Sequence, residues 1–393
     1  MAFMQSMKLS GFLSFPPDSA AIDLRPLNIL IGPNGSGKSN LIEAIELLHA
    51  APTAFAAAIR DGGGVQEWLW KGDKGGKPAT IEAVVEGSKP IPDLRYRLTF
   101  VASGQRTEVI DEAVEETTKR DASDKDVFFY YRFQNGRPVL YVRDVSGGYS
   151  SRNLKREELL PDESVLSQRK GSDVYPEVTW LGQQFARMQT FREWSFGRSM
   201  ALRQPQPASL PTDVLLPDSL NLGLLLNELE HTDAGAEFNQ LLTRFLPRYQ
   251  RFSTRIQGGT VQFYLHESGL KAPVPATRLS DGTLRFMAIL ALLLTPTPPP
   301  LLCIEEPELG LHPDAVALLA NLLAAAATRT QVIVTTHSDV LVSEMTEYAD
   351  SILVCEHRGG TVLQRVDPDK LTYWLNQYRL GEIWRIGELG GNP

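Results

Sequence analysis

The spacing of apolar residues predicts alternating strands and helices at both ends of the chain. Near the N-terminus, MKLSGFLSF and LRPLNILIG predict two strands, and apolar residues then recur at helical spacing from position 38. Further on, a continuous apolar run at 301–305 predicts a buried strand, 314–327 predicts a helix, and 331–335 predicts another buried strand. Strands and helices that alternate in this way form parallel sheets, so we expect one α/β sheet assembled from both ends of the chain.

The middle of the chain has a different pattern. Short runs with partial alternation from position 79 to 145 predict an antiparallel sheet beside the parallel one. The segment 152–246 is rich in Gln, Arg, Leu and aromatic residues and is interrupted by prolines, which favours a helical insertion. Apolar runs on either side of Gly258 and Gly259 predict a hairpin, and 281–294 predicts a helix.

The last part of the chain predicts a second hairpin and a terminal helix. The hairpin is expected around Gly359 and Gly360. One face of the helix is apolar, which favours packing against the core over a surface for a partner. The residues on that face are Leu371, Trp374, Leu375 and Tyr378.

Composition and charge narrow the class of protein. With 393 residues, 42% hydrophobic and 22% charged, the chain can bury a core of its own and is expected to be soluble. Its net charge of −8 means that a contact with nucleic acid would need a local basic patch. Cys303 and Cys355 lie in apolar runs, which argues against a disulfide framework or a cysteine-based metal site. No apolar run approaches the roughly 18 residues that span a bilayer, and no signal-type block is present at the start, so we expect a cytoplasmic protein without membrane contact.

A phosphate-binding pattern follows the second N-terminal strand. Positions 32–39 read GPNGSGKS, which matches G-x-x-x-x-G-K-[ST] between a predicted strand and a predicted helix. Glycines let backbone N–H groups turn toward phosphate oxygens, and the helix N-terminus adds the positive end of its dipole. Lys38 would reach the β- and γ-phosphates of ATP, and the Ser39 hydroxyl would coordinate Mg²⁺. The residues expected to bind ATP are Gly32, Pro33, Asn34, Gly35, Ser36, Gly37, Lys38, Ser39 and Asn40.

Polar residues also end the two buried strands of the C-terminal third. Glu305 could hold Mg²⁺ directly or through water, and Glu306 could polarise the water that attacks the γ-phosphate. His337 comes two residues after the strand 331–335. Ligands of parallel sheets bind at the carboxyl ends of the strands, so we expect His337 to point toward the same phosphates as Lys38 and Glu306. These three residues are the predicted catalytic set.

A further motif lies at the start of the helix predicted over 281–294. As a local pattern, Ser280 or Asp281 caps the helix N-terminus. The string LSDGT at 279–283 also resembles the signature motif of ABC-type ATPases, usually written LSGGQ. The order of phosphate loop, signature, paired acids and histidine matches that superfamily over nearly the whole chain. GPNGSGKSN, EEPELGLHP and TTHS are similar to the soluble RecF/SMC/OLD-like ATPases and less so to transporter subunits.

This resemblance implies an α/β fold of the P-loop NTPase class. The fold would be an ABC-type head with a central, mostly parallel sheet, an antiparallel side sheet and a helical lobe. The implied domains are 1–150 for the N-terminal part of ATPase lobe I, 151–295 for helical lobe II with the signature, and 296–393 for the C-terminal part of lobe I.

The resemblance also implies a mechanism shared between two copies of the chain. Members of this group form a homodimer around ATP, in which Ser280 and Gly282 of one copy would face the nucleotide held by Lys38 and Ser39 of the other. The segment 308–312 would form a loop that communicates across the dimer. Hydrolysis removes the shared γ-phosphate and loosens the pair.

Some positions depart from the family pattern. The paired acids are Glu305 and Glu306 where the family usually has Asp-Glu, and we still expect metal binding and activity. The early basic residue of the family is missing from SGFLSF at 10–15, which leaves its contact with nucleotide open. No strong pattern marks the glutamine that senses Mg²⁺; Gln168 is our choice, with Gln66 and Gln183 as alternatives.

The lengths of the segments favour a head without further parts. The stretch between phosphate loop and signature has room for a compact lobe but not for the coiled-coil arm of members that tether chromosomes. The stretch after Ser338 is too short for the nuclease domain of OLD-type members.

Two arginine-rich segments combine cations with aromatic residues, a composition that suits phosphates and stacked bases. The first spans 185–203 and the second 244–255. The alternative, which the net negative charge favours, is that these arginines cover a helical lobe packed with its own aromatic residues. The arginines considered for nucleic-acid contact are Arg187, Arg192, Arg198, Arg251 and Arg255, and Arg203, Arg244 and Arg248 belong to the same two segments.

These observations predict an Mg²⁺-dependent ATPase that dimerises around ATP. Its first candidate role is a DNA-linked one, in repair, recombination or anti-phage defence. The alternative is an ATP-gated scaffold for a separately encoded effector, for example a nuclease, which predicts an exposed apolar surface. An ABC transporter subunit is disfavoured by the large insertion and by the RecF-like sequences of the motifs.

Overall fold

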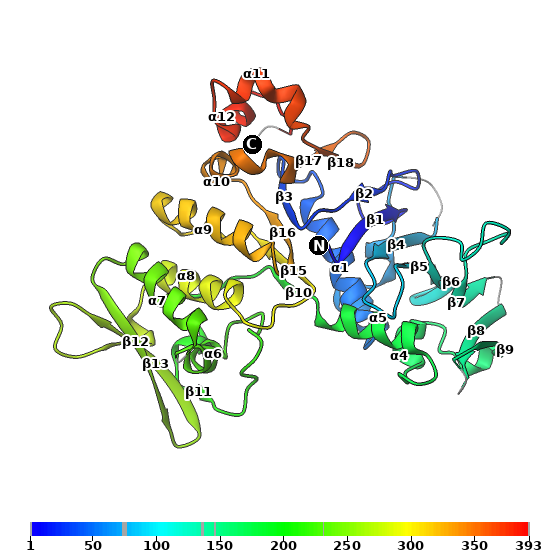
Figure 1. Cartoon of the computed structure of the whole chain (residues 1–393), viewed down its shortest axis with the longest axis horizontal. Coiled ribbons are helices and arrows are strands. Elements are labelled where there is room, and N and C mark those ends of the chain that lie inside the picture. The colour runs from blue at the N-terminus through cyan, green and yellow to red at the C-terminus, as the bar shows by residue number, and fades with distance from the viewer. Residues whose placement is uncertain (1, 73–76, 135–136, 145–146, 231, 392–393) are drawn as a thin grey trace.

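The computed structural model describes residues 2–72, 77–134, 137–144, 147–230 and 232–391. Figure 1 shows a central sheet with helices beside it, a second sheet on one side, a separate lobe on the other side and a helical cap made by the C-terminus. The two sheets with their helices are called lobe I below, and the separate lobe is called lobe II.

The central sheet joins the two ends of the chain. Its order is β10 (Gln189–Phe191), β15 (Leu301–Glu305), β16 (Gln331–Thr335), β3 (Leu27–Ile31), β17 (Ile352–His357) and β18 (Thr361–Arg365). All neighbouring strands are parallel except β17 and β18, which form the predicted C-terminal hairpin. Because β3 lies between β16 and β17, the prediction of one sheet built from both ends is confirmed.

The central strands are buried on both faces, which explains why they are continuous apolar runs. In β3, Ile29 and Ile31 belong to one core cluster, whereas Leu30 belongs to the other. The first cluster contains α8 (Asp281–Leu293) and α9 (Pro313–Ala326), and the second contains α1 (Lys38–Ala50) and α5 (Pro176–Arg187). Cys303 and Cys355 are buried free thiols, as expected.

The predicted antiparallel side sheet is present and has eight strands. The N-terminal strand is part of it, so the sheet begins before the phosphate loop. Its order is β2 (Ile22–Asp23), β1 (Met4–Ser10), β4 (Ala79–Val85), β5 (Leu94–Ser103), β6 (Arg106–Glu116), β7 (Phe129–Gln134), β8 (Arg137–Arg143) and β9 (Tyr149–Asn153). The short helices of lobe I are α2 (Phe55–Asp61), α3 (Val65–Trp68) and α4 (Val165–Gln168).

Lobe II differs from the expected helical lobe in its bounds and in its content. The expected start at residue 151 is too early, because β9 belongs to the side sheet, α5 packs against α1, and β10 joins the central sheet. Lobe II therefore begins after Phe191. It contains α6 (Leu222–Leu229), α7 (Asp233–Phe245) and α8, together with an antiparallel sheet of β11 (Gln206–Pro207), β12 (Tyr249–Gln257), β13 (Thr260–Glu267) and β14 (Val274–Pro275). The β12–β13 hairpin is the one predicted across Gly258 and Gly259.

The C-terminal cap consists of short helices, where one terminal helix was predicted. It contains α11 (Thr372–Leu375) and α12 (Leu380–Arg385), and α12 packs on α10 (Asp339–Glu344). A side chain on Gly381 would meet the Asp339 carbonyl oxygen at 2.0 Å, so the two helices touch through backbone. Short 3₁₀ segments are at Arg156–Glu158, Ala201–Arg203, Ala276–Arg278, Thr346–Ser351 and Pro368–Leu371. Within the described ranges, no helix has both the length and the apolarity that a bilayer crossing needs.

Candidate active site

The phosphate loop connects β3 to α1 and is held by the C-terminal hairpin. Gly37 has a φ of 105°, and a side chain there would meet the Thr361 Oγ1 atom at 2.0 Å. Only glycine tolerates both the left-handed backbone and this close approach. The Thr361 hydroxyl in turn donates to the Ser36 carbonyl oxygen at 2.8 Å. The shape of the loop therefore depends on a residue more than 300 positions further along the chain.

Lys38 folds back over the loop that it belongs to. Its Nζ atom donates to the carbonyl oxygens of Gly32 at 2.7 Å and Pro33 at 3.0 Å. Burial lowers the pKa of Lys38, although Glu305 and Glu306 oppose the shift. A phosphate group would offer this ammonium stronger acceptors than neutral carbonyls do.

Neutral groups occupy the place where the family pattern has an early basic residue. The Ser14 hydroxyl lies 2.6 Å from the Thr361 hydroxyl and accepts a hydrogen bond from the Asn40 amide at 2.6 Å. Asn40 thus connects the first turn of α1 to the N-terminal segment while it also faces the phosphate cavity.

The phosphate loop, β15 and β16 meet at one cavity of about 180 Å³. Residues from all three predicted motifs reach it, as expected for the carboxyl ends of parallel strands. The residues that line it are Asn34, Gly35, Gly37, Lys38, Ser39, Asn40, Glu306, Thr335 and His337. The three predicted catalytic residues therefore share one site.

Glu306 is held in an unusual backbone conformation at the edge of this cavity. Its φ of 45° is in the left-handed region, which costs energy for a residue other than glycine. Its N–H donates to the Thr335 carbonyl oxygen at 3.0 Å, and its own carbonyl accepts from Arg285 of α8 at 3.3 Å. The Glu306 Oε1 atom lies 3.8 Å from Nε2 of His337. The strained residue is one that lines the phosphate cavity.

His337 is suited to act as a neutral imidazole near pH 7. Burial and then the charge of Lys38 lower the pKa of His337, while Glu306 opposes the shift. A neutral ring can donate one hydrogen bond to a phosphate oxygen while its other nitrogen accepts one.

Glu305 is bound by an arginine that follows β10. The Arg192 Nε atom donates to Glu305 Oε2 at 3.0 Å, and the same guanidinium contacts Glu46 at 3.0 Å and Glu43 at 3.2 Å, both on α1. Burial acts to lower the pKa of Arg192, but the three carboxylates outweigh it and raise that pKa. This geometry contradicts the prediction of Arg192 as a nucleic-acid contact, because its guanidinium is committed inside lobe I.

The other oxygen of Glu305 has the environment of a metal ligand. Oε1 is buried and has no hydrogen-bond partner among the described residues. Glu305 is not part of the cavity lining, but it is near enough to the cavity for its charge to act on Lys38. An orphaned carboxylate oxygen at this place fits Mg²⁺, which prefers oxygen ligands from one or two carboxylates together with phosphates. Glu305 and the Ser39 hydroxyl are the residues that would hold the ion.

Gln168 does not lie at this site. Its side-chain amide donates to the Glu163 carbonyl oxygen at 2.9 Å and its Oε1 accepts from the N–H of Leu160 at 2.6 Å. It closes a turn around α4, and it is absent from the lining of the phosphate cavity, so the prediction of Gln168 as a magnesium ligand is wrong. The alternatives Gln66 and Gln183 are exposed on α3 and α5.

The residues after Glu306 form a second polar contact that sequence patterns did not reveal. Glu308 is buried, and its Oε1 accepts a hydrogen bond from the Thr336 hydroxyl. Burial raises the pKa of Glu308. The contact joins the loop after β15 to the residue that precedes His337.

The signature segment caps α8 as its local pattern predicts. The Ser280 hydroxyl accepts from the Thr283 N–H at 3.1 Å. Behind it, Arg203 is 1% exposed, donates to the Leu279 carbonyl oxygen at 2.6 Å and pairs with Asp281. Arg203 therefore supports the signature from inside lobe II and is not one of the surface arginines available to a nucleic acid.

Gly282 lies where the signature approaches the loop after β15. A side chain on Gly282 would meet the Gly310 carbonyl oxygen at 2.8 Å. Neither Ser280 nor Gly282 lines the phosphate cavity of its own chain, and Ser280 is exposed.

Four of the five arginines considered for nucleic acid remain at the surface. Arg187, Arg198, Arg251 and Arg255 are exposed. Arg255 on the β12–β13 hairpin lies over the Tyr264 ring at 5.3 Å. The available cations of the second segment are therefore on lobe II, whereas Arg187 ends α5 of lobe I.

The fold is similar to that of solved Smc heads. The chain superposes with an Smc head bound to the C-winged helix domain of ScpA at a TM-score of 0.59 and 14% identity, covering 94% of this chain and 99% of that chain. An Smc head from Pyrococcus furiosus, with an extended coiled coil and bound to the C-terminal domain of ScpA, gives a TM-score of 0.55 at 14% identity. The match covers 96% of this chain and 99% of that chain. An Smc head with a coiled coil and joint from Pyrococcus yayanosii gives a TM-score of 0.52 at 13% identity. The match covers 96% of this chain and 99% of that chain. At these identities the likeness concerns the fold.

The fold and its motifs define an ABC-type P-loop ATPase of the SMC and RecF group, which confirms the resemblance seen in the sequence. Residues 27–343, most of the chain, match the family described as "AAA domain, putative AbiEii toxin, Type IV TA system", and the chain belongs to that family. Among curated proteins, no sequence gives a significant match.

Proposed function

We propose that this protein hydrolyses ATP in an Mg²⁺-dependent reaction and dimerises around the nucleotide. The observation that carries the proposal is the single cavity lined by Lys38, Ser39, Glu306 and His337. A cation, a metal-binding hydroxyl, a carboxylate and a neutral imidazole around a phosphate loop are the groups that phosphoryl transfer to water requires.

Each residue has a distinct task in this reaction. Lys38 leaves the carbonyl oxygens of its loop and binds the β- and γ-phosphates. Ser39 and Glu305 hold Mg²⁺, which supplies charge neutralisation to the phosphates. Glu306 accepts a proton from the attacking water, and His337 donates a hydrogen bond to the γ-phosphate.

The proposed dimer places the signature of one copy over the nucleotide of the other. Ser280 is exposed and begins a helix of 13 residues whose N-terminus carries the positive end of its dipole. Ser280 does not line the phosphate cavity of its own chain. In the proposed dimer this helix end would face the γ-phosphate bound by the second copy, and hydrolysis would release the pair.

The proposed biological role is coupling of this cycle to DNA, in repair, recombination or anti-phage defence. Exposed arginines on β12, Arg251 and Arg255, together with Arg198 offer the cations for phosphate contacts. The family description, which names a toxin and a toxin–antitoxin system, agrees with the defence role.

The second candidate is a scaffold that holds or releases an effector protein without DNA. Exposed aromatic and apolar residues on the C-terminal cap favour it, since Tyr373 is 67% and Ile386 55% exposed. Tyr378, on the helix face expected to pack as core, is also exposed.

The test is steady-state ATP hydrolysis by the full chain with and without linear duplex DNA, at low and physiological salt. We expect Mg²⁺-dependent hydrolysis that DNA stimulates at low salt and less at physiological salt. Lys38→Ala should abolish nucleotide binding, and hydrolysis by that variant would reveal a contaminating enzyme. Absence of hydrolysis in the wild-type protein contradicts the ATPase proposal, whereas hydrolysis without a DNA response favours the effector scaffold.

A further inference from the structure

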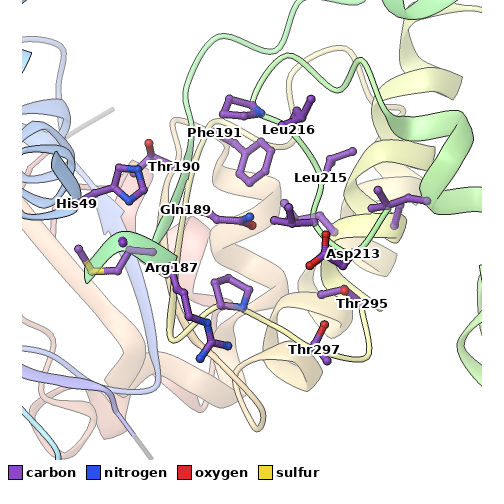
Figure 2. Close-up of a pocket in the computed structure, with 18 residues that line it drawn as sticks. His49, Arg187, Gln189, Thr190, Phe191, Asp213, Leu215, Leu216, Thr295 and Thr297 are labelled. Carbon is purple, nitrogen blue, oxygen red and sulfur yellow. The ribbon is translucent and has the colours of Figure 1, made fainter. Parts of the chain in front are cut away.

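A second cavity, of about 570 Å³, lies where the two lobes meet. Lobe I contributes His49, the end of α5 and β10, and lobe II contributes the loop before α6 together with the end of α8 (Figure 2). Clefts of roughly 300–1,000 Å³ between rigid elements are the usual sites of small-molecule ligands.

This cavity is distinct from the phosphate site. Gln189, which begins β10, and Pro299, which precedes β15, both line it. The phosphate loop instead follows the carboxyl end of β3. No described residue lines both cavities, and β15 and β16 lie between β10 and β3 in the central sheet.

The inner wall of the cavity is apolar. Buried side chains from both lobes line it, so a ligand that enters would cover them from water on several sides. They include Met188, Phe191, Leu215, Leu225, Ala291 and Leu292.

Two opposite charges stand at the rim of this apolar wall. The Arg187 guanidinium and the Asp213 carboxylate both reach the cavity, from different lobes (Figure 2). They form no ion pair with each other, and in the described part of the chain neither side chain has a hydrogen-bond or salt-bridge partner. The Gln189 side chain projects into the same space and adds an amide that can donate and accept.

We propose that this cavity binds an apolar zwitterion of the size of a short peptide. The ligand places an anionic group on Arg187, an ammonium group on Asp213 and apolar side chains against Phe191 and Leu215. One ligand would thus pair with both charges, which form no ion pair with each other. The site is independent of the proposed ATP hydrolysis.

The test measures binding of the dipeptide leucyl-phenylalanine to the full chain by calorimetry. Four forms of the dipeptide are compared: free, N-acetylated, C-amidated and blocked at both ends. The protein variants are Arg187→Gln, Asp213→Asn and Thr297→Trp, which narrows the exposed rim of the cavity. Arg198→Gln, another exposed arginine, is the matched control. Binding of a fluorescent ATP analogue verifies that each variant is folded.

We expect the free dipeptide to bind saturably. Amidation should weaken binding to the wild-type protein about five- to tenfold and have no effect in Arg187→Gln. N-acetylation should likewise weaken binding to the wild-type protein about five- to tenfold and have no effect in Asp213→Asn. Thr297→Trp should weaken binding of the free dipeptide about tenfold or more. The proposal is overturned if no saturable binding occurs, if blocked and free forms bind alike, or if Arg198→Gln changes the pattern as Arg187→Gln does.

Discussion

Arg192 Nε lies 3.0 Å from Oε2 of Glu305, and the other carboxylate oxygen of Glu305 is buried without a hydrogen-bond partner among the described residues. The arginine follows β10 at the point where the chain leaves lobe I for lobe II. It therefore joins the metal-binding carboxylate, two acids of α1 and the connection between the lobes.

We predict that Arg192→Ala impairs turnover more than nucleotide binding. Without the guanidinium, Glu305 is free to rotate and faces two uncompensated carboxylates, so its metal-binding oxygen loses its position. Turnover should fall about tenfold or more, since a misplacement of about 1 Å can cost up to about a hundredfold. Affinity for a fluorescent ATP analogue should change less than about threefold.

Two further variants make this prediction specific. Arg192→Lys should recover only part of the turnover, because an ammonium cannot span three carboxylates as a guanidinium does. Arg198→Ala, on the same connection but exposed, should match the wild type in hydrolysis measured without DNA. Wild-type turnover in Arg192→Ala would show that Glu305 does not depend on Arg192 for its position.

Glu306→Gln should separate nucleotide binding from hydrolysis. The amide cannot accept the proton of the attacking water, so turnover should slow by about a hundredfold or more while ATP stays bound. ATP-bound dimers should then accumulate and be visible by light scattering after size-exclusion chromatography with MgATP. A variant that remains monomeric under these conditions would contradict the two-copy mechanism.

Ser280→Arg should prevent the dimer and spare the single site. The side chain would project from the exposed start of α8 into the proposed interface, whereas the phosphate cavity of the same chain does not include Ser280. We expect unchanged affinity for the fluorescent ATP analogue and no ATP-dependent dimer. Thr232→Arg is the matched control, since Thr232 caps α7 by the same type of hydrogen bond. Loss of ATP binding in Ser280→Arg would mean that the signature acts within its own chain.

Glu112 should make thermal stability depend on pH. Its carboxylate accepts hydrogen bonds from Tyr96 at 2.7 Å, Ser164 at 2.6 Å and the Val165 N–H at 2.9 Å, yet burial raises the pKa of Glu112 from 4.5 to about 7. A pKa raised in the folded state gives a contribution to stability that is complete below pH 4.5 and lost as the pH rises through 7. The loss is roughly 3 kcal/mol at most.

The measurement is the midpoint of thermal unfolding between pH 5.5 and 8. The wild-type midpoint should fall over this range, and Glu112→Gln should flatten the curve because the amide resembles the protonated acid. Glu157→Gln, an exposed acid, should leave the slope unchanged. Equal slopes in all three proteins would place the pH dependence elsewhere.

Local patterns were sufficient to predict the phosphate loop, β15, β16 and the two hairpins. Each is a continuous apolar run or a glycine motif, so neighbouring residues are enough to locate it, although the shape of the phosphate loop also depends on Thr361. The same holds for Ser280, whose hydrogen bond spans three residues.

The role of Arg192 could not be predicted in this way. Its partners are 113, 146 and 149 positions away, and arginines among aromatic residues have the same appearance whether they bind carboxylates inside or phosphates outside. β10 has only three residues, so no periodicity marked it as a strand of the central sheet. Arg192, directly after Phe191, is the one local feature that marks the end of this strand, and its pattern predicts a basic patch.

The position of β3 between β16 and β17 has a consequence for how the protein is made. On the ribosome, β3 emerges long before β16 and β17, the two strands that cover its edges. Until then its backbone N–H and C=O groups and its apolar side chains stay unpaired, a state that favours aggregation. The phosphate loop therefore acquires its shape only after the β17–β18 hairpin has left the exit tunnel, so we expect a nascent chain that lacks this hairpin to bind no nucleotide.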